Sequence, residues 1–235
     1  ILRDPNQRVI SIVEEADATL AQREIRELNC GVYCFDADWL WDNLPQLEPS
    51  GKKQEYYLTD LVARAVAQEI LVEAETLDDI TQVIGINTRV HLAQAEKIAR
   101  QRINERWMLS GVTLVDPATT YIDADVEIGM DTVIEPNAHA KGKSKIGKRC
   151  HIGANSEIRD SEIGDDCAVY ASTLESATME DHVEVGPYSH LRCGAYLCRG
   201  VHLGNYVEVK NSRLADEVKA GHFSYLGDAE IGART

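Results

Sequence analysis

The sequence has no long apolar run. No stretch approaches the roughly 18 consecutive apolar residues that a membrane-spanning helix needs, so we expect no membrane partner. Positive charge is also scarce, because 24 Lys and Arg stand against 39 Asp and Glu and give a formal net charge of −15. This balance opposes non-specific binding to nucleic acid or anionic lipid. An anionic ligand would therefore need a local group of cations.

The six cysteines show no CxxC spacing of the kind found in zinc and redox motifs. Cys30 and Cys34 lie in a strand-like stretch, where a separation of four residues means about 13 Å, too far for a disulfide. We expect free thiols and a cytoplasmic location. The sequence also has neither an initiator methionine nor a secretory leader, and it ends within a repeat, so we expect an internal fragment of a longer protein.

Residues 1–86 alternate between strand-like and helix-like patterns, which predicts an α/β domain. The predicted strands are residues 8–14 and 29–35, and the predicted helices are residues 16–28, 36–47 and 57–68. Asp36 is the expected cap of the second helix. Residues 87–110 carry apolar side chains at helical spacing and predict a connecting helix that ends at Gly111.

After Gly111, aliphatic residues recur every six positions. The first run is Ile122, Ile128, Ile134, Ala140, Ile146, Ile152 and Ile158, one five-residue step leads to Ile163 and Val169, and a later run is Val185, Leu191, Leu197, Leu203 and Val209. This period indicates a hexapeptide β-helix, in which three short strands and their turns close one triangular coil. A β-sandwich is the alternative, but it gives no reason for a constant spacing. Periodicity does not fix the handedness.

Residues 18 apart, or 17 across a five-residue step, should lie one above the other about 4.8 Å apart. The predicted inward columns are Ile128, Ile146 and Ile163; Ile134, Ile152 and Val169; and Ile122, Ala140 and Ile158. Cys150 and Cys167 should be neighbours on adjacent coils with Cα atoms about 5 Å apart.

The same register places Arg192 beneath Lys210 on an outer face. Stacked cations repel unless an anion lies between them, and Arg with Lys is a common phosphate-binding pair, although two solvated surface charges are the alternative. The neighbouring column holds His190, Glu208 and Tyr225. His222 follows one coil later and could take a proton from an amine that attacks an acyl donor. A plain surface or core histidine is the alternative interpretation.

A zinc site has little support. The remaining histidines of the repeat, His139, His151, His182, His190 and His202, show no pair at tight ligand spacing.

In the first part, Glu14, Asn29 and residues 56–60 are candidates, since carboxylates and amides at strand ends can bind sugar hydroxyls, although turn or capping roles are the alternative. Asn87 heads the long helix, where its ordinary role would be the N-cap.

Seven segments, in order along the whole chain, resemble the bacterial family of bifunctional N-acetylglucosamine-1-phosphate uridyltransferases and glucosamine-1-phosphate acetyltransferases. They are IVEEADAT, ELNCGVYCF, EYYLTDLVARA, GINTRVHLAQAE, LRCGAYL, GNYVEVKNSRL and KAGHFSYLGDAEIG. The resemblance implies the C-terminal part of a Rossmann-like nucleotidyltransferase domain over residues 1–86 and a linker helix over residues 87–110. Over residues 111–235 it implies an incomplete left-handed parallel β-helix, and it implies a homotrimer.

By this resemblance, Glu14 and Asn29 would contact the N-acetylglucosamine moiety of a sugar phosphate. Asn87 would bind Mg²⁺ while UTP is attacked and pyrophosphate leaves. Asn29 lies in NCG, where the family has NTG. Asn87 lies in INTR, where the family has VNNR. The glycine-rich UTP loop, its lysine and the aspartate ligand of the metal would lie upstream of Ile1.

The β-helix would carry the acetyltransferase site. His222 would be the general base for attack of the glucosamine amine on acetyl-CoA, and Arg192, Lys210 and Tyr225 would hold the sugar phosphate. From its position in the column, and not from the resemblance, Glu208 is the candidate to orient or polarise His222. The sequence around Arg192 is LRCG, where the family has LRPG. By the same resemblance, the coils that bind coenzyme A would follow the last residue.

Two other functions remain open. The chain could come from another sugar-1-phosphate nucleotidyltransferase with a hexapeptide tail, which would lack the KAGHFSYLG stretch. It could also act only as a trimerising scaffold, because both implied active sites are incomplete.

Overall fold

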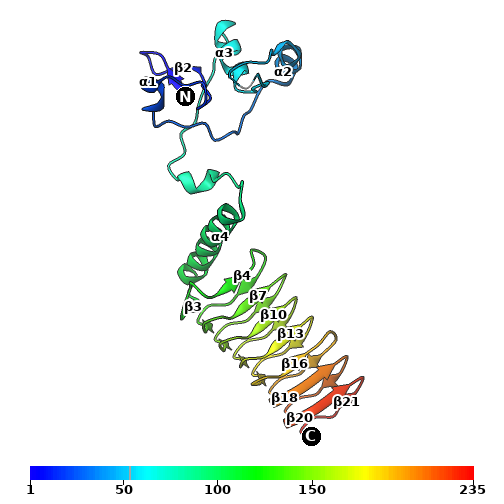
Figure 1. Cartoon of the computed structure of the whole chain (residues 1–235). Helices are drawn as coiled ribbons and strands as arrows, with labels where there is room; N and C mark the ends of the chain where they lie inside the picture. The colour runs from blue at the N-terminus through cyan, green and yellow to red at the C-terminus, as the bar shows by residue number, and fades with distance from the viewer. Residues whose placement is uncertain (53) are drawn as a thin grey trace. The chain divides into compact units, whose positions relative to one another are not determined.

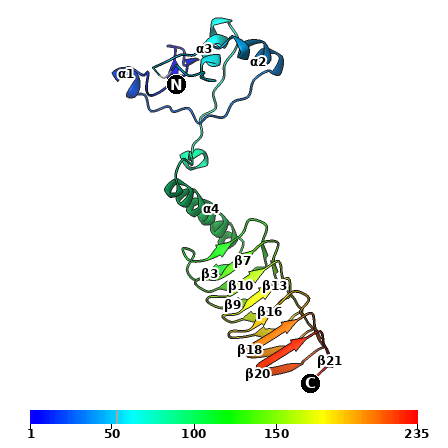
Figure 2. The same ribbon diagram turned by 45° about the vertical axis from the view of Figure 1, so that its right-hand side comes forward.

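The computed structural model describes residues 1–52 and 54–235, and the chain divides into two compact units, Ile1–Ile84 and Gly85–Thr235. Figures 1 and 2 show the elements of each unit. Within the described ranges, no helix combines the length and the apolar character that crossing a bilayer requires.

The first unit contains short helices and one antiparallel pair of strands. Its elements are β1 (Leu2–Arg3), β2 (Val9–Ser11), α1 (Leu20–Arg23), α2 (Ala37–Asn43), η1 (Leu44–Gln46), α3 (Asp60–Ala67) and η2 (Ile80–Val83). The helix predicted from Asp36 is confirmed, since the Asp36 carboxylate accepts a hydrogen bond from the Trp39 N–H at 3.0 Å. Helix α3 buries Leu61, Val62 and Ala65.

Two predictions for this unit are wrong. Residues 29–35 form no strand, because the Asn29 side chain accepts the Gly31 N–H at 3.1 Å and Gly31 turns the chain with a φ of 78°. This local turn competes with an extended ladder. The helix predicted over residues 16–28 is only the four residues of α1, which Thr19 starts through a capping box and which buries no side chain.

The second unit begins with helix α4 (Arg89–Leu109), which confirms the predicted connecting helix. Its N-cap is Thr88, whose hydroxyl accepts the His91 N–H at 3.1 Å, so the capping role considered for Asn87 is wrong. The buried Asn104 donates to the carbonyl oxygens of Pro117 at 2.8 Å and Thr120 at 3.0 Å. These bonds join α4 to the first coil of the β-helix.

The rest of this unit is a parallel β-helix with three faces. The first face holds β3 (Thr113–Leu114), β6 (Val133–Ile134), β9 (His151–Ile152), β12 (Ala168–Val169) and β15 (Glu184–Val185). The second face holds β4 (Tyr121–Ile122), β7 (His139–Lys141), β10 (Glu157–Arg159), β13 (Thr173–Glu175) and β16 (His190–Leu191). The third face holds β5 (Glu127–Ile128), β8 (Lys145–Ile146), β11 (Glu162–Ile163), β14 (Thr178–Met179), β17 (Tyr196–Leu197), β19 (Arg213–Leu214) and β21 (Glu230–Ile231).

Two longer strands turn the corner between the first and second faces. They are β18 (His202–Lys210) and β20 (Lys219–Gly227), which pair with each other in parallel along both faces. β18 pairs with β15 before the corner and with β16 after it. The hexapeptide period therefore predicted the β-helix correctly, and the fold matches the left-handed hexapeptide solenoid.

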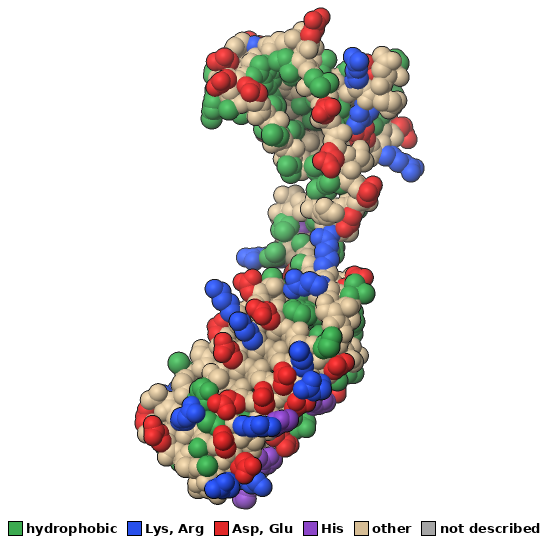
Figure 3. Space-filling view, turned by 180° about the vertical axis from the view of Figure 1, so that it is seen from behind, with side chains coloured by type: hydrophobic (Ala, Val, Ile, Leu, Met, Phe, Trp, Pro, Cys, Tyr) green, Lys and Arg blue, Asp and Glu red, His purple; other side chains and the backbone are tan. Residues whose placement is uncertain are grey.

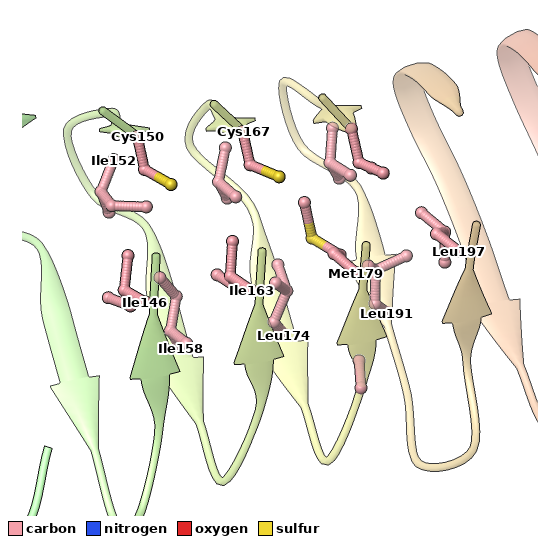
Figure 4. Packing of buried hydrophobic residues seen from close by; sticks show 14 of the residues in the cluster. Ile146, Cys150, Ile152, Ile158, Ile163, Cys167, Leu174, Met179, Leu191 and Leu197 are labelled. Carbon is pink, nitrogen blue, oxygen red and sulfur yellow. The ribbon is translucent and has the colours of Figure 1, made fainter. Parts of the chain in front are cut away.

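The three predicted inward columns are confirmed. Ile146 pairs with Ile128 below and Ile163 above, and the other two columns pair in the same way. All members of these columns are buried. Figure 4 shows the aliphatic side chains stacked between successive coils. Each coil therefore buries its apolar residues against its neighbours.

Cys150 and Cys167 occupy adjacent coils in the core, as the register predicts, because the His151 N–H donates to the Cys167 carbonyl at 2.8 Å. Both side chains point into the interior (Figure 4), and each is 2% exposed. All six cysteines are free. The hydrogen bond with Cys150 and burial both raise the pKa of the Cys167 thiol. The same hydrogen bond lowers the pKa of the Cys150 thiol. Burial therefore protects both thiols from reagents in solvent, whatever their protonation state.

The six thiols should react with a thiol reagent in two classes. Cys30, Cys34 and Cys193 are exposed and should react at once, whereas the buried thiols should react about 100-fold more slowly, since exposing them needs an opening that costs a few kcal/mol. The buried thiols are Cys150, Cys167 and Cys198. Timed labelling with Ellman's reagent, with and without urea, measures both classes. Six equally fast thiols without urea would contradict the packing.

Candidate functional site

The candidate site lies on the second face of the β-helix, in its last coils. His190 pairs with Glu208 and Leu191 pairs with Val209, and on the next strand Glu208 pairs with Tyr225. The Arg192 N–H donates to the Val209 carbonyl at 2.8 Å, so Arg192 lies at the level just below Lys210. The predicted register of β16, β18 and β20 is therefore confirmed.

The carboxylate of Glu208 pairs with Arg192, the lower of the two stacked cations. It accepts a hydrogen bond from Arg192 Nη1 at 2.8 Å, and this bond raises the pKa of Arg192. The chain itself thus supplies an anion beside Arg192, whereas the sequence analysis expected a bound anion from outside the chain. Lys210 remains exposed.

Ion pairs recur along the second face. Lys141 and Arg159 both contact Glu157, at 2.9 and 2.7 Å, and higher up the imidazole of His190 lies 3.1 Å from Glu175. Figure 3 shows acidic and basic side chains interleaved along the β-helix, with histidines among them. Among the residues that the structure describes, no carboxylate lies within ion-pair distance of Lys210, so this ammonium group is available for an anion.

His222 lies before the corner of β20 and is exposed. Its partner on β18 is Asn205, whereas Glu208 is level with Tyr225, on the far side of the corner. The imidazole meets the ring of Phe223 edge-on, with centroids 5.8 Å apart. The structure therefore places Glu208 against Arg192 and does not show it in contact with His222.

An exposed aromatic ladder follows the same corner through three coils. The rings of Tyr188 and Tyr206 stack at 5.5 Å, and those of Tyr206 and Phe223 at 5.2 Å. Each residue has a positive φ, between 47° and 60°. Sequence reasoning missed this ladder, although the spacing of 18 and then 17 residues is the period that was used for the core.

In the first unit, two candidates meet in one groove. Glu14 and Asn29 both line a groove of about 540 Å³. The Glu14 carboxylate accepts a hydrogen bond from the Thr59 hydroxyl at 2.9 Å, which brings residues 56–60 to it. Asn29 donates to the Tyr33 hydroxyl at 2.5 Å. Carboxylate and amide groups in an open groove can bind hydroxyl groups.

Asn87 offers a single oxygen ligand, and because Mg²⁺ needs near-octahedral oxygen coordination, this side chain alone does not make a magnesium site. Asn87 is exposed, and its backbone N–H donates to His91 Nδ1 at 3.4 Å. In the described part of the chain, the only cluster of three metal-ligating side chains is Glu180, Cys198 and Asp216, with ligand atoms within 4.8 Å of one another.

The Glu180 cluster is also a poor metal site. The Glu180 carboxylate already accepts hydrogen bonds from the Tyr196 hydroxyl at 2.7 Å and the Arg199 N–H at 3.1 Å. The guanidinium of Arg213 lies over the Tyr196 ring at 4.3 Å, and burial raises the pKa of the Cys198 thiol. Protein donors and a nearby cation thus take the place that a metal ion would need.

Comparisons with known proteins agree with the sequence resemblance. Residues 125–160 match the family described as bacterial transferase hexapeptide (six repeats). The chain is 45% identical, over 99% of its length, to the bifunctional protein GlmU of Lactobacillus delbrueckii subsp. bulgaricus, and 39% identical, over 99% of its length, to that of Alkaliphilus metalliredigens. It spans 50% and 51% of these two relatives.

Solved structures give weaker likenesses. A GDP-perosamine N-acetyl transferase mutant from Caulobacter crescentus is 21% identical over 53% of this chain and 61% of that chain, with a TM-score of 0.30. The UDP-N-acetylglucosamine acyltransferase of Francisella novicida is 20% identical over 53% of this chain and 58% of that chain, with a TM-score of 0.27. Likenesses this weak carry no argument about function.

Proposed function

Because the chain is a relative of the bifunctional GlmU proteins over 99% of its length, we propose that it is part of an enzyme that makes UDP-N-acetylglucosamine, a cell-wall precursor. The enzyme would first transfer an acetyl group from acetyl-CoA to the amine of glucosamine-1-phosphate. It would then transfer a uridyl group from UTP to the N-acetylated sugar phosphate. The chain spans about half the length of these relatives, so both reactions are proposals for the whole protein.

The acetyl transfer would take place on the last coils of the β-helix. His222 would accept a proton from the sugar amine as the nitrogen attacks the thioester carbonyl. A C–N bond forms, the C–S bond breaks, and coenzyme A leaves with its sulfur. Lys210 and Arg192 would bind the phosphate, with the Tyr225 hydroxyl beside them. The observation that supports this most is the exposed, uncompensated Lys210 above Arg192.

The uridyl transfer would use the groove of the first unit, which fits the proposed nucleotidyltransferase domain. Glu14 and Asn29 would bind hydroxyl or amide groups of the N-acetylglucosamine moiety. Because Asn87 alone does not make a magnesium site, we assign no step to the metal in this chain. A cytoplasmic homotrimer is part of the same proposal.

Two assays test the proposed function on a protein of the relatives' full length. Release of coenzyme A from acetyl-CoA and glucosamine-1-phosphate measures the first reaction, and release of pyrophosphate from UTP and N-acetylglucosamine-1-phosphate measures the second. Pyrophosphate release without acetyl transfer would favour another sugar-1-phosphate nucleotidyltransferase. Loss of both activities in a folded protein would favour a scaffold.

Arg192→Ala should raise the KM for glucosamine-1-phosphate by about 10-fold to 100-fold, since a hydrogen bond to a charged group contributes about 1.5–3 kcal/mol. The kcat should change less. Arg159→Ala is the matched control, because Arg159 forms the same kind of ion pair, with Glu157, lower on the same face. Equal KM values for wild type and Arg192→Ala in the coenzyme A release assay would contradict the phosphate-binding role.

A further inference from the structure

His222 has a polar neighbour that the resemblance does not assign. Asn205 of β18 pairs with His222 of β20 in a parallel ladder. Neighbouring strands lie about 4.8 Å apart, and paired residues direct their side chains to the same side. The amide of Asn205 and the imidazole of His222 are therefore adjacent on the outer surface.

From this placement, and resting on the proposed acetyl transfer, we infer that Asn205 is a positioning residue that holds the imidazole of His222. The Asn205 side chain is half-buried and makes no hydrogen bond with any residue in the described part of the chain. The register continues downward to Pro187, whose ring has no hydrogen-bonding group. The only polar side chain next to Asn205 in its column is thus His222.

The charged groups of both strands lie at other levels. On β18, His202 lies 3.3 Å from Glu184, and Glu208 and Lys210 follow the corner. On β20, Lys219 opposes His202 at the start of the strand, and Tyr225 follows the corner opposite Glu208. Glu208 is bonded to Arg192 at 2.8 Å. None of these groups shares the level of the imidazole.

The aromatic ladder also contacts the imidazole. Phe223 meets the ring edge-on and stacks on Tyr206, which directly follows Asn205. The ring of His222 therefore has the Phe223 ring and the Asn205 amide as neighbours. An amide group at this level can fix the orientation of the imidazole by bonding to one of its ring nitrogens.

The chemistry of the amide suits a general base. If Asn205 Oδ1 accepts the proton of His222 Nδ1, the imidazole is fixed in the tautomer whose Nε2 carries a free lone pair. Nε2 then takes the amine proton, and the same amide oxygen stabilises the imidazolium that forms. Because the amide is neutral, it orients the base without holding it permanently protonated, as a carboxylate in this place would.

Two measurements on Asn205 variants test the inference. The first is the NMR titration of the His222 ring in this chain, which needs no enzymatic activity. Asn205→Asp should raise the His222 midpoint by about one pH unit or more, because an adjacent carboxylate favours the imidazolium. Asn155→Asp is the matched control, since Asn155 is an exposed turn residue several coils away, and it should leave the midpoint unchanged.

The second measurement is acetyl transfer by the full-length protein. Asn205→Ala should lower kcat by about 10-fold to 100-fold with little change in KM, as expected when the residue that orients a functional group is lost. Asn205→Asp should retain more activity and should move the acidic limb of the kcat profile to higher pH.

The outcomes separate the two proposals. A His222 midpoint that responds to Glu208→Gln and not to Asn205→Asp would overturn the inference in favour of Glu208. A midpoint that responds to Asn205→Asp, together with an unchanged kcat in Asn205→Ala, would leave a contact without a positioning role and would also overturn it. Absence of acetyl transfer in the wild-type protein would defeat the proposed function, while the titration would still report the contact.

Discussion

Replacing His222 by alanine should lower the kcat of acetyl transfer by about 100-fold to 10,000-fold, the usual contribution of a general base. The amine of a sugar phosphate is protonated for much of the time near neutral pH and must lose a proton to form the amide. Within the described ranges, His202 is the other histidine on the strands of this pair, and it lies 3.3 Å from Glu184 and level with Lys219. The coenzyme A release assay measures this effect in the full-length protein.

Uridyl transfer provides the internal control for this variant. The groove around Glu14 belongs to the first unit and His222 to the second, so pyrophosphate release should be unchanged. His182→Asn is a matched histidine variant, because His182 is an exposed turn residue with a φ of 60°, a conformation that asparagine adopts readily. Undiminished acetyl transfer in His222→Ala would end the general-base assignment. Equal loss of both activities would indicate misfolding.

The β-helix could be predicted from the sequence because one physical requirement repeats along it. Every coil must bury one aliphatic side chain per face against the coils above and below, so residues such as Ile146 and Ile163 recur at a fixed interval. That interval also sets the register, which is why the relation of Arg192 to Lys210 was correct. The spacing of the inward aliphatic residues was therefore enough to assign the residues between them to their coils.

The buried serines of the β-helix were missed. Ser161 Oγ accepts the Ala177 N–H at 3.1 Å, Ser172 Oγ the Ser189 N–H at 3.0 Å, and Ser189 Oγ the Val207 N–H at 3.0 Å. These hydroxyls satisfy backbone N–H groups at the turns between faces. Small polar residues at the spacing of the aliphatic residues were the available signal.

The first unit was harder to predict, since its elements are short. Residues 29–35 have the alternating pattern of a strand, but an isolated pattern forms a strand only where a neighbouring strand accepts its hydrogen bonds. Here the side chain of Asn29 bonds to Gly31 and to Tyr33. In the site, the bond between Glu208 and Arg192 could not be predicted either. The register fixes the coil on which each residue lies, but it does not fix the side-chain rotamers.

The stability of the β-helix should depend strongly on its inward leucines. Leu191 is fully buried, and in its column it lies between Leu174 and Val209, which are also fully buried. Because the interior is closely packed, its side chains can relax only partly into a cavity at this level. A smaller side chain at this position therefore leaves Leu174 and Val209 facing an empty space.

Leu191→Ala should therefore destabilise the chain by about 2–5 kcal/mol, the range for buried leucine truncations that leave a cavity. The change is expected as a lower urea midpoint in circular dichroism. Leu109→Ala is the matched control, because Leu109 is 83% exposed at the end of α4, and a surface change of this kind typically costs less than about 0.5 kcal/mol. Since Leu191 also precedes Arg192, its loss should weaken sugar-phosphate binding before the whole chain unfolds. Equal midpoints for the two variants would show that the inward column does not support the fold.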